Sequence, residues 1–340
     1  MTRILLIGCG AFGRIHLAAL ARLGPSVTVQ VLEPDPAMRD AAPAGTRFVE
    51  GFDAALAESD AVIIATPPVT HGPLAEAVLR AGRDLFLEKP ATETAGQSAA
   101  LHALAQQSGR IVQLGLFFRF HPKAQAVQAL AQAGGFGRLH HLSARMSGLK
   151  RARGDSGALL NDAVHFADLL PWIAGEAPSH VFATLSDPLG RGREDLALIQ
   201  LRFPSGATGF IEAGCVLPGE HADPVVPGAE TRKLLGLAGS HAVAEVDFMA
   251  ETLRLRRGQH LPAQGGAWLP NHVPAEDLGA AALDTVGVVA AQLEAFLCAV
   301  TTRISQGPDL HEGGVLPLRI LDAARRSAHE MRLVEMDKWN

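Results

Sequence analysis

The first 120 residues alternate short apolar runs with stretches of helical period, and this alternation constrains the fold more than any other feature. The apolar runs, with helical patterns between most of them, are residues 3–7, 27–32, 61–65, 84–87 and 111–114. Continuous apolar strands separated by helices indicate a parallel sheet that is covered on both faces. Right-handed crossovers between such strands predict a doubly wound α/β domain.

After residue 120 the pattern changes to strands joined by tight turns. We expect strands at residues 139–146, 180–185, 196–203, 207–216, 232–237, 242–248 and 252–256. Turn sequences such as Pro204-Ser205-Gly206 favour antiparallel pairing, so these strands predict a large, mainly antiparallel sheet.

Helical patterns accompany this second sheet. One helix is expected at 158–173, two more close the chain near 284–300 and 316–331, and the Gly- and Pro-rich residues 258–280 are expected to form a loop. The sequence therefore predicts an α/β domain over residues 1–120 and an α+β domain over 121–340. The last helix is a candidate to pack back on the first domain.

Composition excludes several classes of protein. The 340 residues carry a net charge of -5, which disfavours nucleic acid and anionic membranes as partners. The chain has no Tyr, which excludes the short-chain dehydrogenases and their catalytic tyrosine. Three widely separated cysteines fit a reducing compartment and offer no metal-ligand set. The longest apolar stretch, 280–300, is interrupted by polar residues, so we expect a cytoplasmic protein.

The turn after the first predicted strand carries the strongest local signal. Residues 8–13 read G-x-G-x-x-G and open a predicted helix. In such a turn Gly8 permits the tight bend, Gly10 lets the backbone approach a pyrophosphate, and Gly13 lets helix and strand pack closely. Glu33 lies 20 positions after Gly13, at the end of the second predicted strand, where a carboxylate binds a ribose. This pattern predicts a dinucleotide site that prefers NAD to NADP, because Glu33 repels a 2′-phosphate.

Further motifs follow the next two predicted strands. Ala65-Thr66-Pro67-Pro68 with His71 follows one of them, and Glu88-Lys89-Pro90 follows the other. The carboxyl ends of parallel strands face the ligand crevice of a doubly wound sheet. We therefore expect both segments to lie near the cofactor, with Lys89 able to hydrogen-bond a reacting oxygen.

Taken together, these motifs resemble the glucose–fructose oxidoreductase and inositol dehydrogenase family, known as Gfo/Idh/MocA. The matching segments are the glycine-rich turn with His16, residues 60–68 with His71, Ala81-Gly82, Glu88-Lys89-Pro90, Gln113-Leu114-Gly115, Arg119-Phe120-His121-Pro122, residues 157–160 with His165 and Asp168, and residues 292–296. The resemblance implies a Rossmann domain followed by a mainly antiparallel sheet that forms homodimers or homotetramers. It also implies an NAD(P)-dependent dehydrogenase of a sugar, cyclitol or sugar derivative.

The resemblance also assigns roles to residues. Lys89 corresponds to the family's catalytic lysine, and His165 to the histidine that exchanges the hydroxyl proton. Asn161 stands where the family usually has Asp, and Asp162 follows it. On an α-helix, residues 161 and 165 share a face, whereas residue 162 is rotated away from it. The role of the family's Asp falls either to Asn161 or, if its side chain turns inward, to Asp162.

The expected site residues fall into three groups. The catalytic residues are Lys89, His165 and Asn161. The cofactor-binding residues are Gly8, Gly10, Ala11, Phe12, Gly13, Glu33, Pro34, Ala65, Thr66, Pro67, His71, Glu88, Lys89 and Gln113. The candidates for substrate binding are Arg119, Lys150, Arg153 and Asp162.

Two other functions remain open at this stage. Some relatives are NAD-assisted glycosidases, which oxidise their substrate transiently and then reduce it again. A non-catalytic sensor that binds NAD(H) is the other alternative, and the presence of both Lys89 and His165 argues against it.

Overall fold

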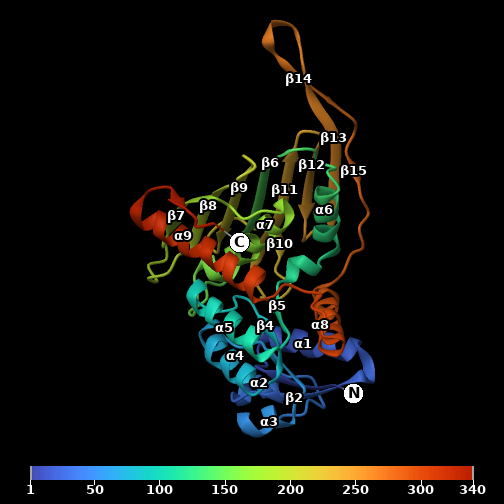
Figure 1. The fold of residues 1–340 in the computed structure, drawn as a ribbon, viewed down its shortest axis with the longest axis vertical. Helices are drawn as coiled ribbons and strands as arrows, with labels where there is room; N and C mark the ends of the chain where they lie inside the picture. The colour runs from blue at the N-terminus through green and yellow to red at the C-terminus, as the bar shows by residue number, and fades with distance from the viewer. Residues whose placement is uncertain (1, 339–340) are drawn as a thin grey trace. The chain divides into compact units, whose positions relative to one another are not determined.

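The computed structural model describes residues 2–338 and divides into two units (Figure 1). The first unit holds the residues up to 120 together with 283–319, and the second holds 121–282 and the residues from 320 onward. The sequence also predicts a division at residue 120. Residues 283–319 are expected in the second domain, whereas their contacts place them in the first unit, because a helical pattern does not reveal which sheet the helix will cover.

A five-stranded parallel sheet forms the centre of the first unit and confirms the doubly wound α/β prediction. Its strand order is β2-β1-β3-β4-β5. The strands are β1 (Thr2–Ile7), β2 (Val27–Leu32), β3 (Ala61–Ile64), β4 (Asp84–Glu88) and β5 (Val112–Gly115). The helices are α1 (Ala11–Arg22), α2 (Pro36–Asp40), α3 (Phe52–Glu58), α4 (His71–Arg80), α5 (Ala95–Ser108) and α8 (Thr285–Thr302).

Alternate side chains of this sheet enter two separate apolar clusters. On one face Leu5, Val62 and Leu85 pack with residues of α3, α4 and α5. On the other face Leu6 and Phe86 pack with residues of α1 and α8. Strand residues alternate between the two faces of a sheet, so a continuous apolar strand fills both clusters.

Helix α8 is the one described helix that is long and apolar enough to span a membrane by length and composition. Its residues Val289, Leu293 and Phe296 are fully buried in the cluster that α1 also lines. Asp284 caps the helix by accepting the N–H of Gly287 at 2.7 Å. The apolar character of α8 is therefore explained by its place in the core of the first unit.

The second unit is built on an eleven-stranded, mainly antiparallel sheet, which confirms the predicted fold class. The main path runs β14-β13-β12-β11-β6-β9-β8-β7-β16, with β10 beside β11 and β15 beside β13, and among the described strands of this sheet only β6 and β9 pair in parallel. The strands are β6 (Leu139–Ser147), β7 (His180–Ser186), β8 (Leu196–Arg202), β9 (Thr208–Gly214), β10 (His221–Ala222), β11 (Glu230–Gly239), β12 (Ala242–Asp247), β13 (Thr252–Pro262), β14 (Trp268–His272), β15 (Glu276–Asp277) and β16 (Val334–Glu335).

Helices α6 (Pro122–Gln132) and α7 (Val164–Ala174) cover one face of this sheet, with α6 against β12 and α7 against β6 and β9. A π-helical turn, Leu159–Ala163, precedes α7. Helix α9 (Leu316–Glu330) begins in the first unit and continues into the second. Its Ser327 hydroxyl accepts the N–H of Ala183 on β7 at 3.0 Å, which ties the end of the helix to the large sheet.

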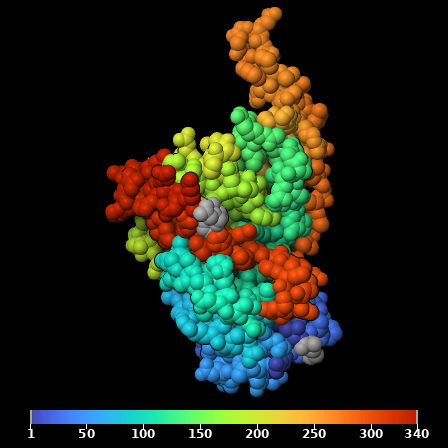
Figure 2. Space-filling model, in the orientation of Figure 1, coloured from blue at the N-terminus to red at the C-terminus, as the bar shows by residue number. Residues whose placement is uncertain are grey.

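Residues 258–280 do not form the expected loop. Strand β13 continues past the end of the sheet and pairs with β14 as a hairpin that projects from the second unit (Figures 1 and 2). Trp268 on this hairpin is 63% exposed. The Gly and Pro residues that favour a loop here are accommodated because the hairpin is open to solvent and Pro270 lies on an edge strand.

Candidate functional site

The glycine-rich turn joins β1 to α1 as the sequence predicts. Gly8 has a φ of +96°, and a Cβ on it would lie 2.8 Å from the carbonyl oxygen of Ala65. A Cβ on Gly13 would lie 2.2 Å from the carbonyl oxygen of Gly8. Both positions therefore require glycine, and the turn brings the first turn of α1 against the end of β1.

Gly10 differs from its two neighbours in the motif. A Cβ on Gly10 would meet nothing within 4 Å, and Gly10 caps α1 without a side-chain hydrogen bond. The space in front of this residue is therefore open. The first N–H groups of α1, at the positive end of the helix dipole, border this space. Ala11 and Phe12 open the helix. An open cradle at a helix N-terminus suits a pyrophosphate, so these residues fit a dinucleotide.

Glu33 lies directly after β2 and is 7% exposed. Its carboxylate accepts the backbone N–H of Cys9 at 2.7 Å and that of Asp35 at 3.0 Å. Burial raises the pKa of the Cys9 thiol, and the Glu33 carboxylate raises it further. Glu33 is thus held against the glycine-rich turn, and Pro34 beside it is exposed.

Arg39 lies beside Glu33 and is not among the site residues that the sequence predicts. Its Nε donates to the carbonyl oxygen of Glu33 at 2.5 Å, and its Nη1 pairs with Glu50 at 2.5 Å. Its guanidinium carbon lies 5.6 Å from the centre of the Phe48 ring. The six-residue separation from Glu33 carries no recognisable motif. The guanidinium is already paired with a carboxylate, which does not favour a 2′-phosphate.

The segments after β3 and β4 meet at His71. Its Nδ1 lies 2.7 Å from the carbonyl oxygen of Pro90 and its Nε2 lies 2.9 Å from that of Thr66. The ring is fully buried, whereas Ala65 and Thr66 are partly exposed and Pro67 is exposed. The ring of His71 therefore contacts the chain itself through both nitrogens.

Glu88 is the last residue of β4 and Lys89 follows it, at the carboxyl edge of the parallel sheet. Glu88 is 6% exposed, and its Oε1 lies 2.8 Å from Nε2 of the fully buried His16. Its Oε2 accepts the backbone N–H of Lys89 at 3.2 Å. Lys89 is partly exposed, whereas Glu88 and His16 are buried.

Two other predicted residues are engaged within the first unit. Gln113 is fully buried, and its Nε2 donates to the carbonyl oxygen of Gln292 at 2.7 Å. The side chain of Arg119 is 9% exposed and pairs with Glu312 at 3.2 Å. The structure thus gives Gln113 and Arg119 contacts that tie β5 and the segment after it to residues 283–319.

In the second unit the π-helical turn changes the expected geometry around Asn161. Its side-chain Nδ2 donates to Oδ1 of Asp162 at 2.9 Å, and the same oxygen accepts Nζ of Lys150 at 2.8 Å. His165, on the first turn of α7, is 8% exposed, and Asp168 is 3% exposed. The prediction assumed an unbroken α-helix from residue 158. The wider π turn alters the angular spacing between 161 and 165, and such turns are frequent at functional sites.

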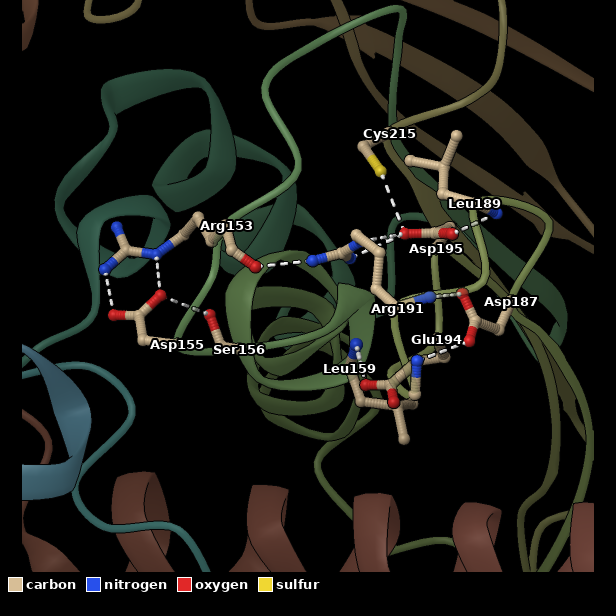
Figure 3. Close-up of polar contacts among 11 residues, drawn as sticks. Arg153, Asp155, Ser156, Leu159, Asp187, Leu189, Arg191, Glu194, Asp195 and Cys215 are labelled. Atoms are coloured by element: carbon tan, nitrogen blue, oxygen red, sulfur yellow. Dashed lines mark hydrogen bonds and ion pairs between the residues drawn. The ribbon is translucent and has the colours of Figure 1, made fainter.

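The loop between β7 and β8 supports this helix and the segment before it (Figure 3). Glu194 accepts the N–H of Leu159 at 3.1 Å and so caps the π turn. Arg191 pairs with the fully buried Asp195 at 2.5 Å and donates to the carbonyl oxygen of Arg153 at 2.5 Å. The Arg153 guanidinium bonds Asp155 through two contacts of 2.8 and 2.5 Å. Its predicted role in substrate binding remains a prediction.

Lys233 lies near this group, although no motif in the sequence marks it. Its side chain is 15% exposed and its Nζ lies 3.8 Å from Asp223. Burial lowers the pKa of Lys233, and the nearby Lys150 acts in the same direction. A lysine on a strand is ordinarily interpreted as solvated, so the sequence does not reveal that the charges of Lys150 and Asp162 act on Lys233.

One group of possible metal ligands occurs among residues 2–338. Atoms of Glu220, His221 and Asp247 lie within 4.8 Å of one another. His221 lies 3.6 Å from Asp247, and Glu220 is bonded to Arg232 at 2.7 Å. An acidic group with these pairings is common without a metal ion, and we assign none to it.

Comparison with known families matches both parts of the chain. Residues 2–116 match the oxidoreductase family with an NAD-binding Rossmann fold, GFO_IDH_MocA, and residues 124–241 match the GFO/IDH/MocA C-terminal domain. Among curated proteins, UDP-N-acetylglucosamine 3-dehydrogenase of Acidithiobacillus ferrooxidans is 29% identical over 324 residues, covering 94% of each chain. Inositol 2-dehydrogenase of Leifsonia xyli is 31% identical over 182 residues, covering 51% of this chain and 54% of that one.

Solved structures show the same fold. Levoglucosan dehydrogenase in complex with NADH and levoglucosan has a TM-score of 0.80 at 20% identity, covering 99% of this chain and 100% of that one. The UDP-N-acetylglucosamine 3-dehydrogenase GnnA from Acidithiobacillus ferrooxidans has a TM-score of 0.78 at 26% identity, covering 96% of each chain. Because family models match both parts of the chain, this chain is an NAD-binding oxidoreductase of the Gfo/Idh/MocA family.

Proposed function

We propose that this protein catalyses the NAD-dependent oxidation of a hydroxyl group on a sugar, cyclitol or sugar derivative, or the reverse reduction. The observation that carries the proposal is the open space at Gly10 beside a buried Glu33, which suits NAD. The relatives named above are dehydrogenases of a nucleotide sugar, inositol and levoglucosan, which supports a substrate with ring hydroxyl groups.

In the proposed reaction, residues of this chain take up the hydroxyl proton and stabilise the charge that develops on the oxygen. When bound, NAD accepts a hydride from the carbon that bears the hydroxyl group. We assign His165 as the general base that takes the hydroxyl proton, because a histidine suits proton exchange near neutral pH. Lys89 stabilises the negative charge that develops on the oxygen. Asn161 orients a substrate hydroxyl through its amide, while Asp162 is paired with Lys150.

A substrate panel tests the proposal. The purified protein is incubated with NAD or NADP and with UDP-N-acetylglucosamine, myo-inositol, scyllo-inositol or levoglucosan, and NADH formation is followed by fluorescence. We expect NADH with at least one member, a preference for NAD, and a large loss of kcat in Lys89→Ala. Tight NADH binding with product formed but no net NADH would support the glycosidase alternative. NADH binding without any reaction would support a sensor.

We further propose that the chain forms a homodimer or homotetramer through the exposed face of its large sheet. An open pocket of about 570 Å³ lies on that face, lined by side chains that include Phe182, Phe210 and Leu333. Val243 on the same sheet is 46% exposed. Exposed apolar surface of this kind is typical of self-association. Sedimentation velocity of wild type and Phe210→Glu tests it, and a monomeric wild type would contradict it. The proposed location is the cytoplasm.

A further inference from the structure

The segment Glu88-Lys89-Pro90 is held on both sides by a buried histidine. On one side His16 of α1 lies 2.8 Å from the Glu88 carboxylate, and on the other His71 of α4 lies 2.7 Å from the carbonyl oxygen of Pro90. Both histidine side chains are fully buried. Lys89 is thus the partly exposed residue between two fixed neighbours.

We propose that His16 and His71 are positioning residues for Lys89, because they fix the residues immediately before and after it. This inference rests on the proposed function of Lys89 in proton and charge handling. Neither histidine touches the reacting atoms in this account, since each ring is enclosed by the chain.

The contact with His16 fixes the Glu88 carboxylate. One oxygen of Glu88 lies against His16 and the other accepts the N–H of Lys89 at 3.2 Å. A Cβ on Gly115 would lie 2.6 Å from the first oxygen, so the carboxylate occupies space that only glycine leaves. A buried carboxylate without a donor is costly. His16 supplies that donor, and Phe12 and Phe86 fix its ring by edge contacts at 5.6 and 5.4 Å between ring centres.

The ring of His71 lies between the ends of two strands. It stands between the carbonyl oxygens of Pro90 and Thr66, which follow β4 and β3. Burial lowers the pKa of His71, while the two carbonyl oxygens and the charge of Glu88 act in the opposite direction and Lys89 lowers it further. A neutral ring carries one N–H and can donate to only one of the two carbonyl oxygens, and we assign the N–H to Nδ1, toward Pro90, which has the shorter distance.

Asn and Gln substitutions distinguish the hydrogen bond made by histidine Nδ1 from the one made by Nε2. The amide nitrogen of Asn lies near the position of histidine Nδ1, and that of Gln lies near Nε2. His16 uses Nε2 toward Glu88, so His16→Gln keeps the contact and His16→Asn loses it. His71 uses Nδ1 toward Pro90, so His71→Asn keeps the contact and His71→Gln loses it. The two sites therefore predict opposite orders of effect for the same pair of amides.

The primary readout is the reactivity of Lys89 itself. The rate at which acetic anhydride labels Lys89 is measured by peptide mass spectrometry across a pH series, with and without NADH. We expect the labelling profile to change in His16→Asn and His71→Gln and to be closer to wild type in His16→Gln and His71→Asn. With the sugar that reacts in the panel, kcat should be at least about tenfold lower in the disruptive member of each pair, with KM little changed.

A matched control is His121 in the second unit, which is 2% exposed and lies 3.0 Å from Glu251. His121→Asn should lower the melting temperature without altering Lys89 labelling. If Asn and Gln behave alike at both sites, or only the melting temperature falls, the positioning role is refuted. If the labelling pattern holds while Lys89→Ala turns over normally, the proposed role of Lys89 in the reaction fails, although the two histidines still fix its placement.

Discussion

The carboxylate of Glu33 accepts the backbone N–H of Cys9 at 2.7 Å, which ties the end of β2 to the middle of the glycine-rich turn. A hydrogen bond therefore joins the carboxylate that we propose to bind the ribose to the turn that we propose to bind the phosphates. A change at Glu33 should alter both cofactor selection and the placement of the turn.

Substituting Glu33 separates its charge from its hydrogen bonds. Glu33→Gln keeps an acceptor for Cys9 but removes the negative charge that repels a 2′-phosphate. We expect the preference for NAD over NADP, measured as the ratio of kcat/KM values, to fall at least about tenfold. Glu33→Ala should lose the same preference and also bind NADH more weakly. An unchanged ratio in both variants would show that Glu33 does not contact the ribose.

Gly10 and Gly13 form a matched pair for testing the cradle. Gly13→Ala places a Cβ 2.2 Å from the Gly8 carbonyl oxygen, so we expect a loss of about 2 kcal/mol in the free energy of unfolding. Gly10→Ala meets nothing within 4 Å and should cost less than about 1 kcal/mol, since it changes only the helix cap. Gly10→Ala should nevertheless weaken NADH binding strongly. Wild-type NADH affinity in this variant would place the cofactor elsewhere.

The glycine-rich turn shows why part of the site is predictable from sequence. The requirement at Gly8 and Gly13 is a local steric one, and Glu33 lies one strand away, so short-range patterns are sufficient. The return of 283–319 to the first unit depends on distant contacts such as the pair of Arg303 with Asp84 at 2.6 Å. No local pattern encodes such a pair.

The same distinction applies to the second unit. Strand-like runs joined by tight turns predict the large sheet, because such turns favour antiparallel pairing. The π turn at Leu159–Ala163 and the placement of Lys233 near Lys150 depend on packing between distant elements. Strand β14 was not predicted because all five of its residues are exposed. A strand with no buried face does not require the alternation of apolar and polar residues by which a sequence marks a strand.

The stability of the fold should fall on mild acidification. Burial lowers the pKa of His71 and of His121, so the unfolded chain binds protons more readily than the folded one. The free energy of unfolding therefore decreases as the pH falls below about 6.5, the ordinary pKa of histidine. His121→Gln should show a smaller decrease than wild type in thermal melts across this range. An equal or larger decrease in the variant would contradict the assignment.

The buried pair of Lys150 and Asp162 gives a further prediction. The two side chains are 9% and 3% exposed and lie 2.8 Å apart. Asp162→Asn leaves a buried ammonium without its carboxylate, so we expect a loss of about 3 kcal/mol in the free energy of unfolding. The double variant Lys150→Met with Asp162→Asn should recover much of that loss. Additive effects in this double-mutant cycle would show that the two residues do not interact.

Comparing Lys89→Ala with wild type in the NAD-dependent oxidation of the substrate panel tests the central claim most directly. We predict NADH formation by wild type with at least one sugar or cyclitol. In Lys89→Ala we predict a kcat about 10²- to 10⁴-fold lower, with NADH affinity retained. Equal turnover by the variant, or no reduction of NAD by wild type with any member, would contradict the account.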